Sequence, residues 1–188
     1  KKNSLTVLKN LQYFCDTESN NERDNDFNRS KYMAENIGNI LEIEGKEVKI
    51  ALSAHNGHIT TFYKQIETGY WLKQKYGSRY YALGYEFNQG EILGFDIIDD
   101  ELVFRDLIIG PSKNGTLGFL ISTSVGQDCF IDFAGKKIPE WFSQKQLCSD
   151  ILGCYGQVGC SQRYTNVILA KSYDGIIYID ETEAANRM

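Results

Sequence analysis

The stretch from residue 48 to residue 76 changes abruptly from the pattern of a strand to that of a helix, and this change constrains the fold most. Residues 48–54, VKIALSA, are a short apolar run rich in β-branched side chains, which is typical of a buried strand. From Ile59 onward, apolar side chains recur at helical intervals until Tyr76, where Gly77 indicates the end of a helix. A strand followed directly by an amphipathic helix is typical of α/β proteins.

The rest of the chain predicts helices before this unit and mainly strands after it. Helical spacing predicts helices over residues 5–15 and 27–41, separated by an exposed acidic loop, and Gly45 is the expected stop of the second helix. Short separators at residues 88–90 and 99–100 predict antiparallel hairpins. The strands expected after the unit are 79–87, 91–98, 101–109, 129–133 and 175–180, with a helix over 116–125. We therefore expect an α/β protein with a mixed sheet flanked by helices.

Charge and hydropathy exclude two classes of partner. The 20 lysines and arginines are outnumbered by 25 acids, and the net charge of −5 with no basic stripe argues against nucleic acid. No apolar run reaches the roughly 18 residues that a membrane span needs, so no membrane partner is expected. The five cysteines are an odd number, which argues against a complete disulfide framework and points to a reduced, cytoplasmic protein.

The two histidines of the chain both lie in the turn between the expected strand and helix, HNGH. His55 should end the strand, and in open α/β sheets ligands bind at that edge. Gly57 permits a tight turn, Asn56 could cap the helix, and the helix dipole would keep His58 neutral. Two imidazoles here can act as general base or acid, although polar loop residues without a catalytic role are the alternative. No metal or other cofactor is expected, because residues 53–65 offer neither carboxylate nor cysteine.

Several sequence blocks together resemble one known family. They are a strand ending in Ala-His-Asn-x-His, a helix with Gly-x-x-Leu-x-x-x-Tyr-Gly, a strand leading to Phe-x-x-Gly, and an upstream helix with Arg-Asp-x-x-Met-Ala-x-Asn. The matching positions are 54–58, Gly69, Leu72, Tyr76, Gly77, Phe87, Gly90, Arg29, Met33, Ala34 and Asn36, followed by 114–117, 129–133 and 173–178. Ser30 replaces the aspartate, and Leu52 stands where many members carry tryptophan. In this set of blocks the chain resembles the erythromycin esterase family.

The resemblance implies how the chain is organised. Residues 1–188 would be the C-terminal part of a single erythromycin esterase-like domain, one lobe of a larger esterase-like fold. The other block that the family needs, a glycine-rich strand end with His-Gly and glutamates, has no counterpart in this sequence. We therefore expect the N-terminal half of the same protein as a partner, and an incomplete active site in this chain.

The resemblance also implies an activity. The family suggests a metal-independent hydrolase that uses a His/Glu-activated water on an ester or a macrolide lactone, with macrolide resistance as one role. The small-molecule substrate would meet His55 and His58 as catalytic residues, and Asn56 and Arg29 as substrate-binding residues. The alternative from another class is a non-catalytic ligand-binding homologue or an isolated lobe.

Overall fold

The computed structural model describes residues 22–45, 47–62, 67–98, 101–149 and 163–184. The chain divides into two compact units, residues 1–82 and 83–188, and each is described by itself. The first unit contains α2 (Glu22–Glu44), α3 (Asn56–Ile59), α4 (Thr68–Tyr76) and the 3-10 turn η1 (Gly77–Arg79). The second contains β1 (Leu83–Ile98), β2 (Glu101–Ile109), α5 (Leu117–Ser124), β3 (Cys129–Asp132), the 3-10 turn η2 (Glu140–Ser143), β4 (Lys145–Ser149), β5 (Tyr164–Ile168), α6 (Leu169–Ser172) and β6 (Gly175–Thr182). The helix expected over residues 5–15 lies outside the described residues.

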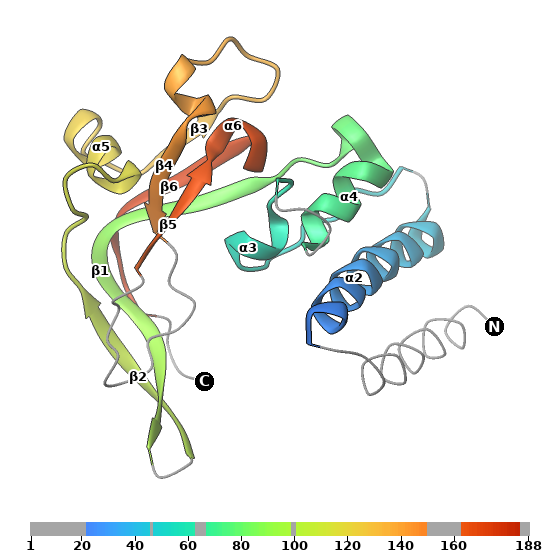
Figure 1. Ribbon diagram of the computed structural model, residues 1–188, viewed down its shortest axis with the longest axis horizontal. Helices are drawn as coiled ribbons and strands as arrows, with labels where there is room; N and C mark the ends of the chain where they lie inside the picture. Colours follow the sequence, from blue (N-terminus) through green and yellow to red (C-terminus); the bar gives the residue numbers. More distant parts are fainter. Residues whose placement is uncertain (1–21, 46, 63–66, 99–100, 150–162, 185–188) are drawn as a thin grey trace. The chain divides into compact units, whose positions relative to one another are not determined.

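In the first unit, α2 and α4 pack against each other (Figure 1). The helix expected over 27–41 is confirmed, and it ends as predicted before Gly45, whose φ of 109° is rarely open to other residues. It starts earlier than expected, at Glu22, so part of the stretch predicted as a loop is helical. The Thr68 hydroxyl of α4 is buried and donates to the Met33 sulfur of α2 at 3.8 Å.

Residues 48–54 do not form the strand that their composition predicts. No strand of the described chain pairs with them, and Val48, Ile50 and Leu52 are 40, 38 and 42% exposed. An extended segment becomes a stable strand only when neighbouring backbones satisfy its hydrogen bonds. The prediction of a buried strand is therefore wrong for this chain, and His55 follows an extended, unpaired segment.

The helix expected from Ile59 to Tyr76 is also interrupted. The short α3 ends at Ile59 because Thr60 adopts an extended backbone, with φ −59° and ψ 144°. The second helix, α4, begins at Thr68 and ends as predicted at Gly77. The described chain thus has two helices where the apolar periodicity indicated one.

In the second unit, four strands form a mixed sheet in the order β2-β1-β6-β3, which confirms the expected fold class. The first half of β1 pairs parallel with β6, and its second half pairs antiparallel with β2. The turn predicted at residues 88–90 is wrong, because β1 continues through it as one long bent strand (Figure 1). Gly90 allows this course: its φ is 122°, and a Cβ there would lie 2.2 Å from the Thr182 carbonyl oxygen.

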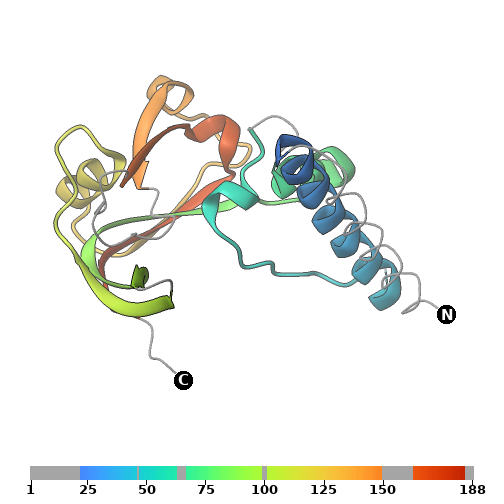
Figure 2. The same ribbon diagram turned by 60° about the horizontal axis from the view of Figure 1, so that its bottom comes forward.

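A second, two-stranded sheet of β4 and β5 completes this unit, and the sequence analysis did not predict it. The helix α5 was predicted, and it is capped by Thr116, whose hydroxyl accepts from the Phe119 amide at 3.3 Å. This helix contacts β1, β6 and β4 (Figure 2). A Cβ on Gly118 would lie 2.8 Å from the Phe87 carbonyl oxygen, so a glycine is needed where α5 approaches β1.

A buried polar cluster holds the bend of β1 in place. The guanidinium of Arg163 donates to the Gly110 and Asn88 carbonyl oxygens, and at 3.2 Å to the Ser112 hydroxyl. The Asn88 side chain accepts from the Ser112 amide at 3.0 Å. Hydrogen bonds to a charged group contribute about 1.5–3 kcal/mol each, so Arg163 ties β1 firmly to the segment that follows β2.

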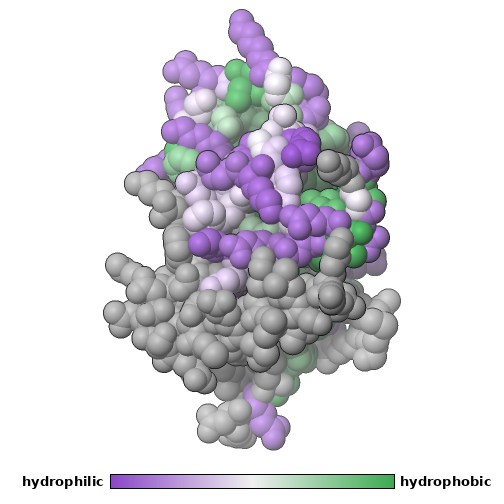
Figure 3. Space-filling view, turned by 90° about the vertical axis from the view of Figure 1, so that its right-hand side faces the viewer, coloured by the Kyte–Doolittle hydropathy of each residue, from purple (hydrophilic) through white to green (hydrophobic). Residues whose placement is uncertain are grey.

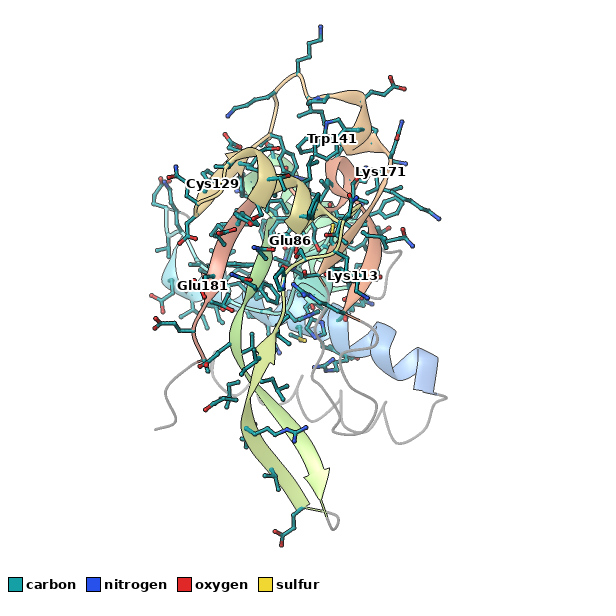
Figure 4. All side chains as sticks on the ribbon, turned by 90° about the vertical axis from the view of Figure 1, so that its left-hand side faces the viewer. Glu86, Lys113, Cys129, Trp141, Lys171 and Glu181 are labelled. Atoms are coloured by element: carbon teal, nitrogen blue, oxygen red, sulfur yellow. The ribbon has the colours of Figure 1, made fainter. Side chains whose placement is uncertain are left out.

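Glu86 lies beside this cluster and is only 2% exposed, among side chains from several elements (Figure 4). Its carboxylate accepts from the Ser149 amide at 2.9 Å and from the Phe87 amide at 3.2 Å. Burial raises the pKa of Glu86, and the hydrogen bonds from Ser149 and Phe87 and the charge of Arg163 oppose this rise only in part.

The surface of the described residues mixes hydrophilic residues with smaller hydrophobic patches on the face that Figure 3 presents. No helix in the described part of the chain combines the length and the apolar character needed to cross a membrane.

We predict that Glu86 makes folding stability depend on pH. Its folded pKa lies above its unfolded one, so between the two values the folded protein holds a proton that the unfolded chain has lost, and the free energy of unfolding falls as pH rises. Glu86→Gln removes this dependence, and the stability of the wild type relative to the variant should therefore decrease with rising pH. Urea unfolding at a series of pH values measures it. Glu91→Gln, at an exposed position of the same strand, is the control. The prediction would be contradicted if the free energy of unfolding of the wild type relative to Glu86→Gln changed with pH no more than it does relative to Glu91→Gln.

Candidate functional site

The HNGH turn closes on itself through its own hydrogen bonds. His55 occupies the N-cap position of α3, with φ −59° and ψ 148°, and its Nδ1 accepts from the Gly57 amide at 3.1 Å. The His58 amide donates to the His55 carbonyl oxygen at 2.9 Å. The expectation that Asn56 caps this helix is wrong: Asn56 is already its first residue, and the imidazole of His55 supplies the cap. His58 lies in the helix, as predicted.

The cap determines which ring nitrogen of His55 carries the proton. A nitrogen that accepts a hydrogen bond must present a lone pair, so the neutral ring is protonated on Nε2. The ring is half-buried, and a Cβ on Gly57 would lie 3.3 Å from Nδ1. The small residue at position 57 therefore leaves room for the imidazole over the start of the helix.

His58 faces a carboxylate that the sequence analysis did not single out. Its Nδ1 lies 3.6 Å from Oε2 of Glu67, the residue at the N-cap position of α4. The His58 side chain is 35% exposed and that of Glu67 is 21% exposed, yet the Nδ1 atom itself is shielded from solvent. The exposed surface of the His58 side chain therefore comes from atoms other than Nδ1.

Close backbone contact between the end of α3 and the start of α4 brings these two side chains together. A Cβ on Gly69 would lie 2.1 Å from the Ile59 carbonyl oxygen and 2.5 Å from that of Thr60, distances that no side chain allows. The Tyr80 hydroxyl donates to the same Ile59 oxygen at 2.7 Å. Gly69 and Tyr80 thus fix the HNGH turn against the segment that carries Glu67.

Three of the four predicted site residues lie in the same turn, and the fourth lies on another helix. His55, Asn56 and His58 share one turn, whereas Arg29 lies exposed on α2. Their catalytic and substrate-binding roles stay predictions. Among the described residues, no three histidine, cysteine or acidic side chains are grouped as a metal would require. Cys129 and Cys148 are free thiols, and the other cysteines lie outside the described residues.

Solved structures share this fold. A succinoglycan biosynthesis protein matches with a TM-score of 0.71 and 18% identity, over 87% of this chain and 40% of its own. A Bacillus cereus protein matches with a TM-score of 0.67 and 19% identity, over 85% of this chain and 39% of its own. A mutant of the erythromycin esterase EreC in its open conformation matches with a TM-score of 0.59 and 16% identity, over 91% of this chain and 40% of its own. This chain therefore spans about 40% of the length of these proteins.

The chain combines a mixed α/β fold with two histidines on one capped turn. The erythromycin esterase family model matches residues 1–182, and the chain belongs to this family. The resemblance of the sequence is thereby confirmed. A comparison with curated proteins gave no match.

We predict that Gly69→Ala destabilises the first unit, although glycine to alanine in a helix normally stabilises. The new methyl group would meet backbone carbonyls that cannot move aside, and overpacking of this kind costs about 1–3 kcal/mol. Gly38→Ala in α2 is the matched control, because its methyl group would meet only the flexible end of Lys75 and the Tyr76 hydroxyl. Thermal unfolding should show a lower midpoint for Gly69→Ala and an unchanged or higher one for Gly38→Ala. Equal midpoints would show that the close contact of α3 and α4 is not required.

Proposed function

We propose that the whole protein hydrolyses an ester or a macrolide lactone with an activated water, and that this chain contributes His55 and His58. The observation that carries the proposal is the pair of imidazoles on one capped turn in a member of the erythromycin esterase family. Only histidine titrates near neutral pH without a strong perturbation, so such a pair can supply both the acid and the base that ester hydrolysis needs.

The chemistry requires a proton acceptor and a stabiliser of negative charge. Water must lose a proton as its oxygen attacks the carbonyl carbon, and the carbonyl oxygen becomes an oxyanion. The departing alkoxide must then gain a proton, so that the products are an acid and an alcohol. The Nε2–H that the cap leaves on His55 is a donor of the kind that stabilises an oxyanion. Asn56, beside it in the turn, would add a donor to the substrate.

We further propose that residues outside this chain complete the site. The chain spans about 40% of the length of its structural relatives. Segment 48–54 is strand-like in sequence but has no partner among the described strands, which supports a larger sheet in the whole protein. Additional carboxylates, contributed by that remaining part, would help to activate the water. Arg29, an exposed cation on α2, would bind a polar or anionic group of the substrate.

We expect His55→Ala to lower the turnover of the full-length protein by roughly 10²–10⁴-fold, the usual loss when a positioned acid, base or donor is removed. A panel of p-nitrophenyl esters and macrolide lactones, followed by colour release and by the mass gain of one water, provides the assay. Gln127→Ala, at an exposed position of the second unit, is the control and should keep the turnover of the wild type. Undiminished turnover in His55→Ala would remove this residue from the reaction. Binding without turnover by the wild type would favour the non-catalytic alternative.

We also expect the activity to be independent of a metal. The His55 Nδ1 is engaged in the cap, and the described residues supply no cluster of three ligands. Chelation by 1,10-phenanthroline should leave turnover unchanged, and elemental analysis of the active protein should find no stoichiometric zinc. Stoichiometric zinc that disappears in His55→Ala would overturn this expectation.

A further inference from the structure

We propose that one face of the four-stranded sheet docks an apolar helix from the part of the whole protein that lies outside this chain. This surface, the open face, is centred on Tyr85, Ile177 and Phe130. Like the site proposed above, it requires a protein longer than this chain, but it requires no hydrolysis. The open face belongs to the second unit, which carries none of the predicted site residues.

The three residues form a row across neighbouring strands. Tyr85 of β1 pairs with Ile177 of β6, and Ile177 pairs in turn with Phe130 of β3. Side chains paired in this way lie on the same face of a sheet. Tyr85 is 51% exposed and Phe130 is 58% exposed, while Ile177 between them is half-buried. The row bears no charge, so the open face offers two aromatic rings and an aliphatic side chain to a partner.

The opposite face of the same strands is covered within this unit. Glu86 and Tyr178, the next residues of β1 and β6, lie on that face because successive side chains alternate, and they are 2 and 0% exposed. A Cβ on Gly118 of α5 would lie 3.3 Å from Oε1 of Glu86, and the Ser149 amide of β4 donates to Oε2 at 2.9 Å. The described elements of the second unit thus bury one face of the sheet and leave the row on the other face largely exposed.

The pairing of β1 with β6 indicates what the open face accepts. These two strands are parallel and occupy the middle of the sheet order β2-β1-β6-β3. Parallel strands are normally covered on both faces, and usually by helices, because a crossover must return the chain from the end of one strand to the start of the next. An uncharged row of aromatic and aliphatic side chains matches the apolar stripe of such a helix and offers nothing to a charged ligand.

The length of the relatives indicates where this helix comes from. This chain spans about 40% of the solved structures that share its fold, so more than half of a protein of that length lies outside it. Within the second unit, α5 already lies on the opposite face, and α6 has only four residues. A second copy of the chain is the alternative occupant. A domain normally contains both layers that cover its sheet, however, so the cover belongs to the same polypeptide.

Photo-cross-linking in the full-length protein identifies what lies on the open face. Phe130→p-benzoylphenylalanine keeps an aromatic side chain at this exposed position, and irradiation joins it to neighbouring groups. We expect cross-links to a segment of the same polypeptide outside the 188 residues, identified by mass spectrometry of the digested protein. Leu120→p-benzoylphenylalanine is the matched control, because Leu120 is 43% exposed and lies on α5. It should not reach that segment.

Other outcomes of this experiment decide against the docking surface. Cross-links that stay within the 188 residues would overturn the proposal, and so would cross-links between two copies, which a mixture of ¹⁴N- and ¹⁵N-labelled protein distinguishes. Thermal unfolding gives a second readout: Phe130→Asp should lower the midpoint of the full-length protein, because it buries an unpaired charge, and Leu120→Asp should change it much less. Equal midpoints would also contradict the proposal. Neither measurement uses turnover, so a failed docking surface leaves the hydrolase function standing, and a protein without esterase activity leaves the docking surface standing.

Discussion

The geometry of the HNGH turn depends on one close approach between backbones, which exists only because position 69 has no side chain. The start of α4 lies against the carbonyl oxygens of Ile59 and Thr60, closer than any Cβ could come. Tyr80 donates to the Ile59 oxygen and satisfies a carbonyl at the end of α3. An α3 of only four residues has little stability of its own, since isolated short helices are marginal in water. Contacts from outside the helix therefore hold the imidazoles in place.

Much of the fold followed from local patterns, and the failures have a common cause. The helices α2 and α5 and the strands β3 and β6 were predictable, because each has a clear period and a recognisable end. Residues 48–54 have the composition of a strand, but a strand also needs a partner, and the sequence of the segment does not supply one. Likewise, Asn88 and Gly90 are typical turn residues, yet here Asn88 bonds to Ser112 and Gly90 bends a continuous strand. In both cases tertiary pairing decides the outcome, and local propensity does not.

The candidate site was only partly predictable, because one of its contacts also depends on tertiary structure. A search for titratable residues in a strand-to-helix turn finds His55 and His58 directly, and family resemblance reinforces them. Glu67 escapes such a search because it precedes a different helix from the one that carries His58, so their contact depends on how α3 meets α4. The signal that could have found it is weak: an acid at the start of a helix, just before the glycine of a family motif. The cap by His55 was missed because asparagine is the commoner N-cap residue.

The two partners of β1 also imply an order of assembly for the second unit. The second half of β1 pairs with β2, the next strand along the chain, so that ladder closes a loop of only a few residues. The first half pairs with β6, and Asn88 and Asp180, which bond across that region, are 92 residues apart in the chain. Loop-closure entropy grows with the intervening length, and non-local ladders form slowly. The hairpin of β1 and β2 is therefore the early template of the sheet, and its free β1 edge remains open until the C-terminal strand arrives.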